Sequence, residues 1–327
     1  MGFSSSDNPD FSSTAASPLG AVHVSPMPPP HARRPWRHLV LFLLTVTTTM
    51  FAGAEHFASF YLDFGSRAPD LSTFQFILNG LWYSASILAI LGAHEFGHYY
   101  ACRHYGVDAS LPYFLPAPLP LTGTLGAFIR IRQPIPGKRE LFDIGVAGPI
   151  AGFIVAVPVL LIGMSLSRVT ALPADTRGFV ELGEPLLFKG IAWLLWGTPP
   201  DGYSINMHPM ASAAWFGLLA TALNLFPIGQ LDGGHISYAV FGPKSTLVTL
   251  VTVACLIGLT LLSSSWLVWT ALTVMMLVVF GPRHPRTIDE DIPLDRTRLW
   301  LAAAALLMFV ICFSPAPIEP FDLVARP

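Results

Sequence analysis

The chain has 327 residues, of which 53% are hydrophobic and 12% are charged. An average soluble domain has about 25% charged residues, so this composition excludes an ordinary soluble enzyme and a disordered chain. The net charge of −2 and the lack of a basic stripe exclude a nucleic-acid partner. The three cysteines lie far apart and make neither a CxxC metal pair nor an even-numbered disulfide framework. These features indicate a polytopic membrane protein in contact with the lipid bilayer.

The first segment, residues 1–36, is rich in serine and proline and is predicted to be a disordered cytoplasmic tail. It lacks the apolar h-region of a secretory signal peptide. Its acidic residues Asp7 and Asp10 argue against a transit peptide. The tail therefore favours a cell inner membrane over an organellar membrane.

Apolar stretches fill most of residues 37–314, and each meets or approaches the roughly 20 residues that a helix needs to cross a bilayer. They predict an all-α polytopic membrane protein with about six or seven transmembrane helices, followed by a short C-terminal tail at 315–327. With a cytoplasmic N-terminus, 13 of the 18 Lys and Arg residues fall on the cytoplasmic side, as the positive-inside rule requires. The expected spans are 39–60, 76–102, 144–166, 209–226, 247–262, 266–280 and 299–313.

Between the second and third stretches, residues 108–137 contain six prolines and cannot continue as a helix. Residues 123–132 lie among them and end in alternating apolar and basic side chains. We predict a small membrane-inserted β-hairpin or sheet here. The loop 167–208 is too short for a typical further domain, and its tryptophans Trp193 and Trp196 indicate an interfacial belt or a short surface helix.

The second stretch carries the pattern His-Glu-x-x-His at residues 94–98. The i, i+4 spacing places His94 and His98 on one helix face, so both imidazoles can bind one metal ion, and zinc suits such ligands. Glu95 stands at the edge of that face, where it can take a proton from a metal-activated water. Each charged group costs about 2.5–3.5 kcal/mol inside hydrocarbon, which favours a function over chance.

A third metal ligand is expected from residues 224–235, which combine an asparagine, a proline and several glycines. Apart from Glu95, Asp232 is the only acid well inside the apolar stretches. The sequence around it breaks a helix, and broken backbone at membrane depth needs a cavity or protein partners. We therefore expect Asp232 to point at the metal and Asn224 to hydrogen-bond the substrate or a developing oxyanion.

Two motifs together, His-Glu-x-x-His at 94–98 and Asn-x-x-Pro-x-x-x-Leu-Asp-Gly-Gly at 224–234, resemble the site-2 protease family of intramembrane zinc metalloproteases. The resemblance covers about residues 76–240, which would be the catalytic core. Within it, residues 123–126 look like the membrane-inserted β-element of that family. Residues 145–153 look like its third core helix.

The resemblance implies an endopeptidase that acts in regulated intramembrane proteolysis. It would hydrolyse a peptide bond within or near a transmembrane segment of a single-span protein that another protease has already trimmed. His94, His98 and Asp232 would be the zinc ligands, Glu95 would be the general base and acid, and Asn224 would assist the substrate or transition state. Unlike some family members, the chain shows no PDZ domain between its core helices.

Two other interpretations use the same residues. An ion-coupled membrane transporter also carries intramembrane His, Glu and Asp, but such carriers often have paired broken helices, and only one such segment is found here. An inactive zinc-binding scaffold is not favoured, since Glu95 is present. His235 either supports the metal site or is a cavity histidine. The glycines Gly145, Gly148 and Gly152 indicate close helix packing.

Overall fold

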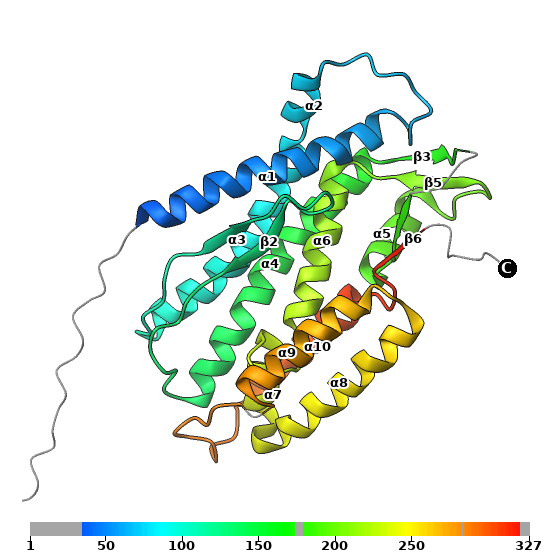
Figure 1. The fold of residues 1–327 in the computed structure, drawn as a ribbon. Helices are drawn as coiled ribbons and strands as arrows, with labels where there is room; N and C mark the ends of the chain where they lie inside the picture. The colour runs from blue at the N-terminus through cyan, green and yellow to red at the C-terminus, as the bar shows by residue number, and fades with distance from the viewer. Residues whose placement is uncertain (1–34, 174–178, 283, 321–327) are drawn as a thin grey trace, which may run out of the picture. The chain divides into compact units, whose positions relative to one another are not determined.

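The computed structural model describes residues 35–173, 179–282 and 284–320. Within these ranges, four helical stretches are long and apolar enough to cross a membrane (Figure 1). They are α1 (Pro35–Tyr61), α2 with α3 (Thr73–His104), α4 (Lys138–Leu166), and α7 with α8 (Asp232–Leu262). The polytopic membrane architecture is thereby confirmed. All of the predicted tail except 35–36, where α1 begins, lies outside the described residues.

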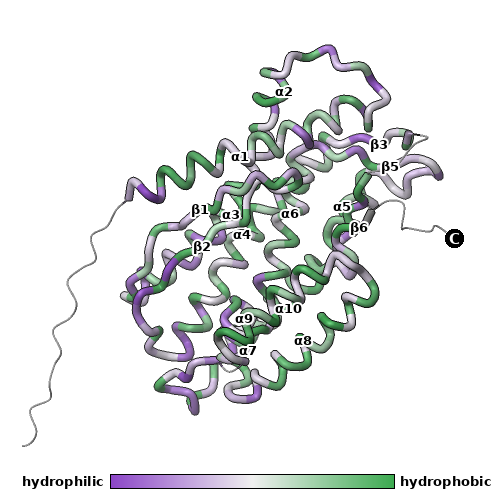
Figure 2. The backbone as a smooth tube through the Cα atoms, in the orientation of Figure 1, coloured by the Kyte–Doolittle hydropathy of each residue, from purple (hydrophilic) through white to green (hydrophobic). Residues whose placement is uncertain are grey.

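Shorter apolar helices complete this architecture. A turn at Gly80 divides the expected second span, and glycine fits this place because an added Cβ would lie 2.2 Å from the Met50 carbonyl oxygen of α1. The two helices on either side of Gly80 are α2 (Thr73–Asn79) and α3 (Leu81–His104). The other short helices are α5 (Leu186–Trp196), α6 (Pro209–Asn224), α9 (Trp266–Phe280) and α10 (Arg296–Cys312). In the colouring of Figure 2, the helices are largely hydrophobic and several of the connections between them are hydrophilic.

The predicted small sheet is present and consists of two antiparallel strands, β1 (Tyr113–Pro116) and β2 (Thr124–Phe128). The alternating residues expected to form a strand lie mostly beyond β2, where one bridge joins Ala109 to Ile131. The sequence did not give the position of the partner strand β1, because a proline ends it and others surround it. In this part of the chain, proline-rich sequence favours a short edge pairing.

Two further strand pairs were not predicted. In the loop 167–208, β3 (Arg168–Ala171) pairs with β5 (Tyr203–Asn206) on either side of the expected short helix α5. β4 (Val180–Leu182) pairs with β6 (Ile318–Pro320), so part of the predicted C-terminal tail lies against this loop. These strands have three or four residues each, which is too short for a clear alternation in the sequence.

The sequence predicted a break in the helical structure around Asp232 and a new span beginning at residue 247. In the structure, a helix begins earlier. α7 (Asp232–Phe241) begins at Asp232 itself and leads through a short 3-10 turn, Gly242–Lys244, into α8 (Ser245–Leu262). Gly233 and Gly234 make this possible: an added Cβ would lie only 2.0 Å and 2.3 Å from backbone carbonyl oxygens of the preceding connection. The glycines therefore start a helix in a crowded place, where a side chain would prevent it.

The core lies where α3, α4 and α6 pack against one another (Figure 1). Large side chains such as Tyr83 of α3, Leu160 of α4 and Leu218 of α6 are fully buried there. α9, by contrast, exposes most of Val278 and Leu267. Two of these helices, α3 and α6, carry motif residues, and α7, which begins at Asp232, packs against α4.

Candidate metal centre

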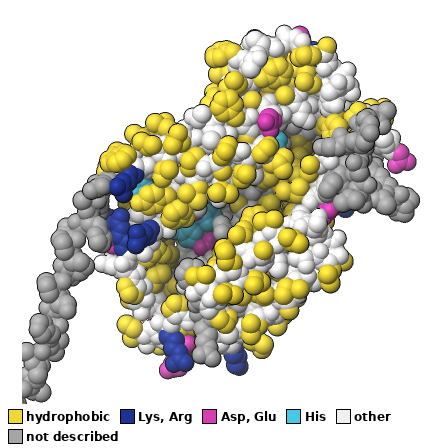
Figure 3. Space-filling model, in the orientation of Figure 1, with side chains coloured by type: hydrophobic (Ala, Val, Ile, Leu, Met, Phe, Trp, Pro, Cys, Tyr) yellow, Lys and Arg dark blue, Asp and Glu magenta, His cyan; other side chains and the backbone are white. Residues whose placement is uncertain are grey.

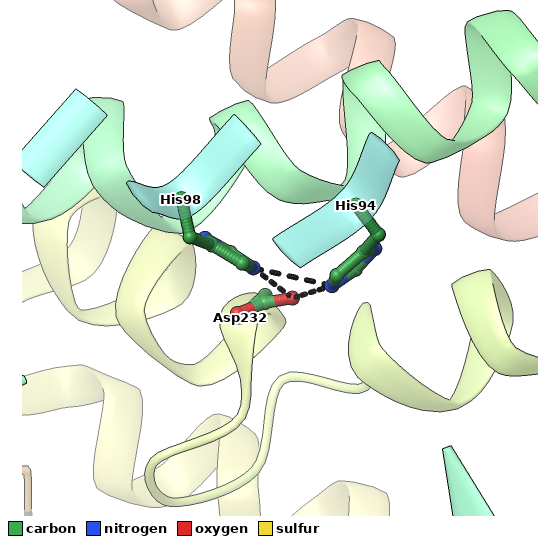
Figure 4. Close-up of side chains that lie close together, drawn as sticks. All are labelled: His94, His98 and Asp232. Atoms are coloured by element: carbon green, nitrogen blue, oxygen red, sulfur yellow. Dashed lines mark hydrogen bonds and ion pairs between the residues drawn. The ribbon is translucent and has the colours of Figure 1, made fainter. Parts of the chain in front are cut away.

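Two histidines of α3 and one aspartate at the start of α7 meet in the core (Figure 4). The Nε2 atoms of His94 and His98 are 3.1 Å apart. Oδ2 of Asp232 lies 3.2 Å from Nε2 of His94 and 3.3 Å from Nε2 of His98. Among the described residues this is the one group of three such side chains that could share a metal ion. The three predicted ligands are thus brought together.

The connection between α6 and α7 turns the chain so that Asp232 faces α3. Leu225 caps the C-terminus of α6, and Gly229 takes a left-handed backbone with φ of +50°, which glycine adopts at little steric cost. The Ile228 carbonyl accepts a hydrogen bond from the Leu231 backbone N–H, which closes the turn. Asp232 then occupies the first position of α7 and projects its carboxylate toward the histidines.

Glycines of α4 make room for the two histidines. An added Cβ at Gly148 would lie 2.0 Å from Nε2 of His98, and one at Gly152 would lie 3.1 Å from Cβ of His94. On the α3 side, an added Cβ at Gly97 would lie 2.5 Å from the Ala147 carbonyl oxygen. The close helix packing interpreted from the glycine spacing is confirmed. It goes further than expected, because the glycines touch the ligand rings themselves.

The second ring nitrogen of His98 also has a partner. Its Nδ1 lies 2.7 Å from the Ile144 carbonyl oxygen of α4, an acceptor to which the ring N–H donates. This bond fixes the ring orientation and leaves Nε2 as the ligand atom, which is the usual arrangement for a metal-binding histidine. No feature of the sequence pointed to this carbonyl, because the contact joins residues 46 positions apart.

Glu95 and Asn224 line a cavity of about 130 Å³ beside His94. Glu95 is buried, and the Asn224 amide nitrogen lies 3.3 Å from Nε2 of His94. The other walls come from β2, α3, α4 and α6. On the face drawn in Figure 3, histidine and acidic atoms lie at the bottom of a hollow in a largely hydrophobic surface. All five predicted site residues therefore lie in one small region of the fold.

The three ligand atoms fit a tetrahedral zinc ion. Zn–N and Zn–O bonds are about 2.0–2.1 Å long, so neighbouring ligands of a tetrahedral ion stand roughly 3.3–3.4 Å apart. The distances here, 3.1, 3.2 and 3.3 Å, form a nearly regular triangle of that size. Two imidazoles and one carboxylate also leave a fourth position free for water or substrate, as catalytic zinc sites require.

His235 lies outside this triangle. Its Nδ1 is 2.7 Å from Nε2 of His284, which belongs to the connection between α9 and α10. The sequence pointed to His235 through its position after the glycine pair, but it gave no signal for His284.

Comparisons with known proteins agree with these motifs. The model of Peptidase family M50 matches residues 82–263. The probable zinc metalloprotease EGY2, chloroplastic, of indica rice (Oryza sativa) is 31% identical over 271 residues, covering 77% of this chain and 48% of its own length. The corresponding EGY2 of Arabidopsis thaliana is 32% identical over 230 residues, covering 68% of this chain and 39% of its own length.

A related protein of Arabidopsis thaliana, the probable zinc metalloprotease EGY1, chloroplastic, is 29% identical over 298 residues. That match covers 85% of this chain and 52% of the relative. The chain thus spans about half the length of the curated relatives it matches, or less. No solved structure matches it.

Proposed function

Because the chain belongs to peptidase family M50, we propose that it is an intramembrane zinc metalloprotease. It would act as an endopeptidase on a peptide bond within or near a transmembrane segment of a single-span membrane protein. The observation that carries this proposal is the ligand triangle of the buried His94 and His98 and the half-buried Asp232, with the buried Glu95 beside it, among apolar helices. Intramembrane ionisable groups so arranged are expected to have a function.

Zinc is the ion that we propose for the triangle. Two imidazole nitrogens and one carboxylate oxygen are ligands that zinc accepts, and their spacing fits a tetrahedral ion. When bound, zinc supplies a Lewis acid that polarises water and the peptide carbonyl. The protein residues then have to hold the ion, orient the substrate and move the proton.

Glu95 is the residue that we assign to proton transfer. It lines the cavity next to His94, so it can take a proton from the attacking water and return it to the leaving amine. Asn224 lines the same cavity and brings a side-chain amide, a donor suited to the oxyanion that develops on the carbonyl oxygen.

The cavity also bears on the substrate. β2 supplies Leu125, Gly126 and Ala127 to its wall. A helical substrate must unwind locally before cleavage, since its carbonyls are already hydrogen-bonded within the helix. A substrate with helix-weakening residues near the cut, already trimmed by another protease, would best enter so small a space.

We further propose a cell inner membrane with the N-terminus on the cytoplasmic side. The distribution of positive charge supports this orientation. It places on the cytoplasmic side the Lys and Arg residues near the end of α3, near the start of α4 and in the α9–α10 connection, as the positive-inside rule favours. The ion-coupled transporter gains no support, since the family and the relatives are peptidases.

The test compares the wild type with Glu95→Gln, both purified in detergent. We expect near one zinc per chain in both proteins and chelator-sensitive cleavage of membrane-spanning peptides by the wild type alone. Glu55→Gln is the matched control, because Glu55 is an exposed acid of another membrane helix, α1. This variant should cleave the peptides at the wild-type rate. A wild type without zinc would contradict the ligand assignment, and cleavage by Glu95→Gln would contradict the role of Glu95.

A further inference from the structure

The chain between α9 and α10 lies against the first turns of α7, close to Asp232. We name residues 284–295 the α9–α10 connector. His284 of this connector shares a hydrogen bond of 2.7 Å with His235. The His284 ring also stacks on the ring of Tyr238, with centroids 4.3 Å apart and an angle of 17° between the planes. The connector therefore contacts α7 through two side chains, one helical turn apart.

The same connector is fixed to the start of α4. Asp289 accepts a hydrogen bond of 2.6 Å from the Lys138 backbone N–H, and the Lys138 ammonium donates one of 2.8 Å to the Glu290 carbonyl oxygen. Tyr238 donates its hydroxyl proton to the Glu290 carboxylate at 2.9 Å. Lys138 and Tyr238 are both buried. These bonds leave His284 little freedom relative to either helix.

The position of His235 on α7 connects this arrangement to the metal centre. It lies three residues after Asp232, so the two side chains are neighbours on the helix surface. Gly145 of α4 packs against both: an added Cβ there would lie 3.0 Å from Cβ of His235 and 3.5 Å from the Asp232 carbonyl oxygen. Any rotation of α7 that displaces Asp232 must therefore also displace His235.

We propose that His284 is a positioning residue for the metal centre. Through the hydrogen bond with His235, it holds α7 in the rotation that brings the Asp232 carboxylate to His94 and His98. The inference rests on the proposed function only in that the three ligands bind zinc. Burial lowers the pKa of His284, which favours the neutral imidazole. Because its Nδ1–H donates to the Pro285 carbonyl oxygen at 2.7 Å, its Nε2 accepts the hydrogen bond from His235.

The experiment follows zinc rather than cleavage. We compare the rate at which a chelator removes zinc from the wild type, His284→Ala and His284→Gln, each as the full chain in detergent. Removing a group that orients metal ligands typically costs about 10–100-fold in affinity or activity, so we expect zinc loss from His284→Ala to be about tenfold faster or more. His284→Gln keeps a hydrogen-bonding group and should recover most of the difference.

A spectroscopic measurement separates positioning from general loosening. The visible absorption of the cobalt-substituted protein reports the geometry around the ion, and we expect it to change in His284→Ala. The matched control is Ile288→Ala, because Ile288 is on the same connector and 94% exposed. It should lose zinc at the wild-type rate and keep the wild-type spectrum.

Several outcomes would overturn the proposal. One is wild-type zinc loss and an unchanged cobalt spectrum in His284→Ala, and another is equally fast loss from Ile288→Ala. Failure of His284→Gln to recover zinc retention would show that the hydrogen bond is not responsible. If His284→Ala does not fold, His235→Ala removes the same bond from the α7 side and must lose zinc faster. The zinc content of the wild-type protein tests the proposed function separately from the role of His284.

Discussion

The helices around the ligands are apolar, and so are α8 and α9, which pack against each other as the α8–α9 hairpin, but the two groups are packed differently. In α4, an added Cβ at Gly148 would collide with a ligand ring, whereas at Gly258 of α8 it would meet nothing within 4 Å. Val146 of α4 is 4% exposed, and Val278 of α9 is 80% exposed. Composition alone therefore does not distinguish a helix that builds a site from one whose surface faces lipid. The distinction comes from which residues are packed against other helices.

The largest effect is expected from adding one methyl group next to a ligand. In Gly148→Ala, the new Cβ would lie 2.0 Å from Nε2 of His98, so the ring or α4 must move. Overpacking of a tight interior costs about 1–3 kcal/mol, and each 1.4 kcal/mol is about tenfold in a binding constant. We expect zinc affinity to fall by about tenfold or more, measured by competition with a chelator.

The same substitution in the hairpin provides the control. Gly258→Ala enters open space within a helix, where alanine is favoured over glycine by roughly 0.5–1 kcal/mol. It should leave zinc affinity unchanged and keep or slightly raise the thermal stability. Equal zinc affinity in Gly148→Ala and Gly258→Ala would contradict the packing difference between the two regions.

Much of the site could be predicted because its signals are local or chemically unusual. The spacing of His94 and His98 places both on one face of any helix, whatever surrounds it. Asp232 stands out because acids are rare within apolar stretches and helix-breaking residues surround this one. The small sheet was signalled by prolines and an alternating segment.

The remainder depends on contacts between distant parts of the chain. The Ile144 carbonyl that orients His98 is a backbone group, so no residue type marks it. His284 lies 49 residues from His235, in a connection that lacks any periodic pattern. Gly148 was interpreted as a packing residue, but only the fold shows that its neighbour is a metal ligand. The start of α7 at Asp232 likewise depends on carbonyls that crowd its glycines.

A smaller effect concerns the opposite end of α6, the helix that ends at Asn224. His208 caps its N-terminus by accepting a hydrogen bond from the Met210 backbone N–H, and its ring contacts the edges of Phe60 and Trp82. Burial lowers the pKa of His208 from 6.5 to about 4. The folded protein therefore holds His208 neutral at pH values where the unfolded chain protonates it. The folding free energy associated with the neutral His208 is complete above about pH 6.5 and is lost as the pH falls toward 4.

We expect His208→Asn to keep the cap without this titration, since asparagine is a good N-cap residue. Between pH 7.5 and pH 5, the wild type should lose on the order of 1–2 kcal/mol more stability than the variant, because one pKa unit corresponds to about 1.4 kcal/mol. Thermal unfolding in detergent at both pH values measures the difference. Equal losses of stability in the two proteins would contradict the burial of the His208 ring away from water.

The smallest effect is expected on the exposed face of the hairpin. Val278→Ala removes two methyl groups that contact little of the protein, so the free energy of unfolding should change by less than about 0.5 kcal/mol. Val146→Ala is the matched substitution in α4 and should cost clearly more, because it leaves a cavity between packed helices. Thermal unfolding in lipid nanodiscs compares the two. If Val278→Ala proved as destabilising as Val146→Ala, the α9 face would have to be packed against protein rather than lipid, and the contrast between the two regions would not hold.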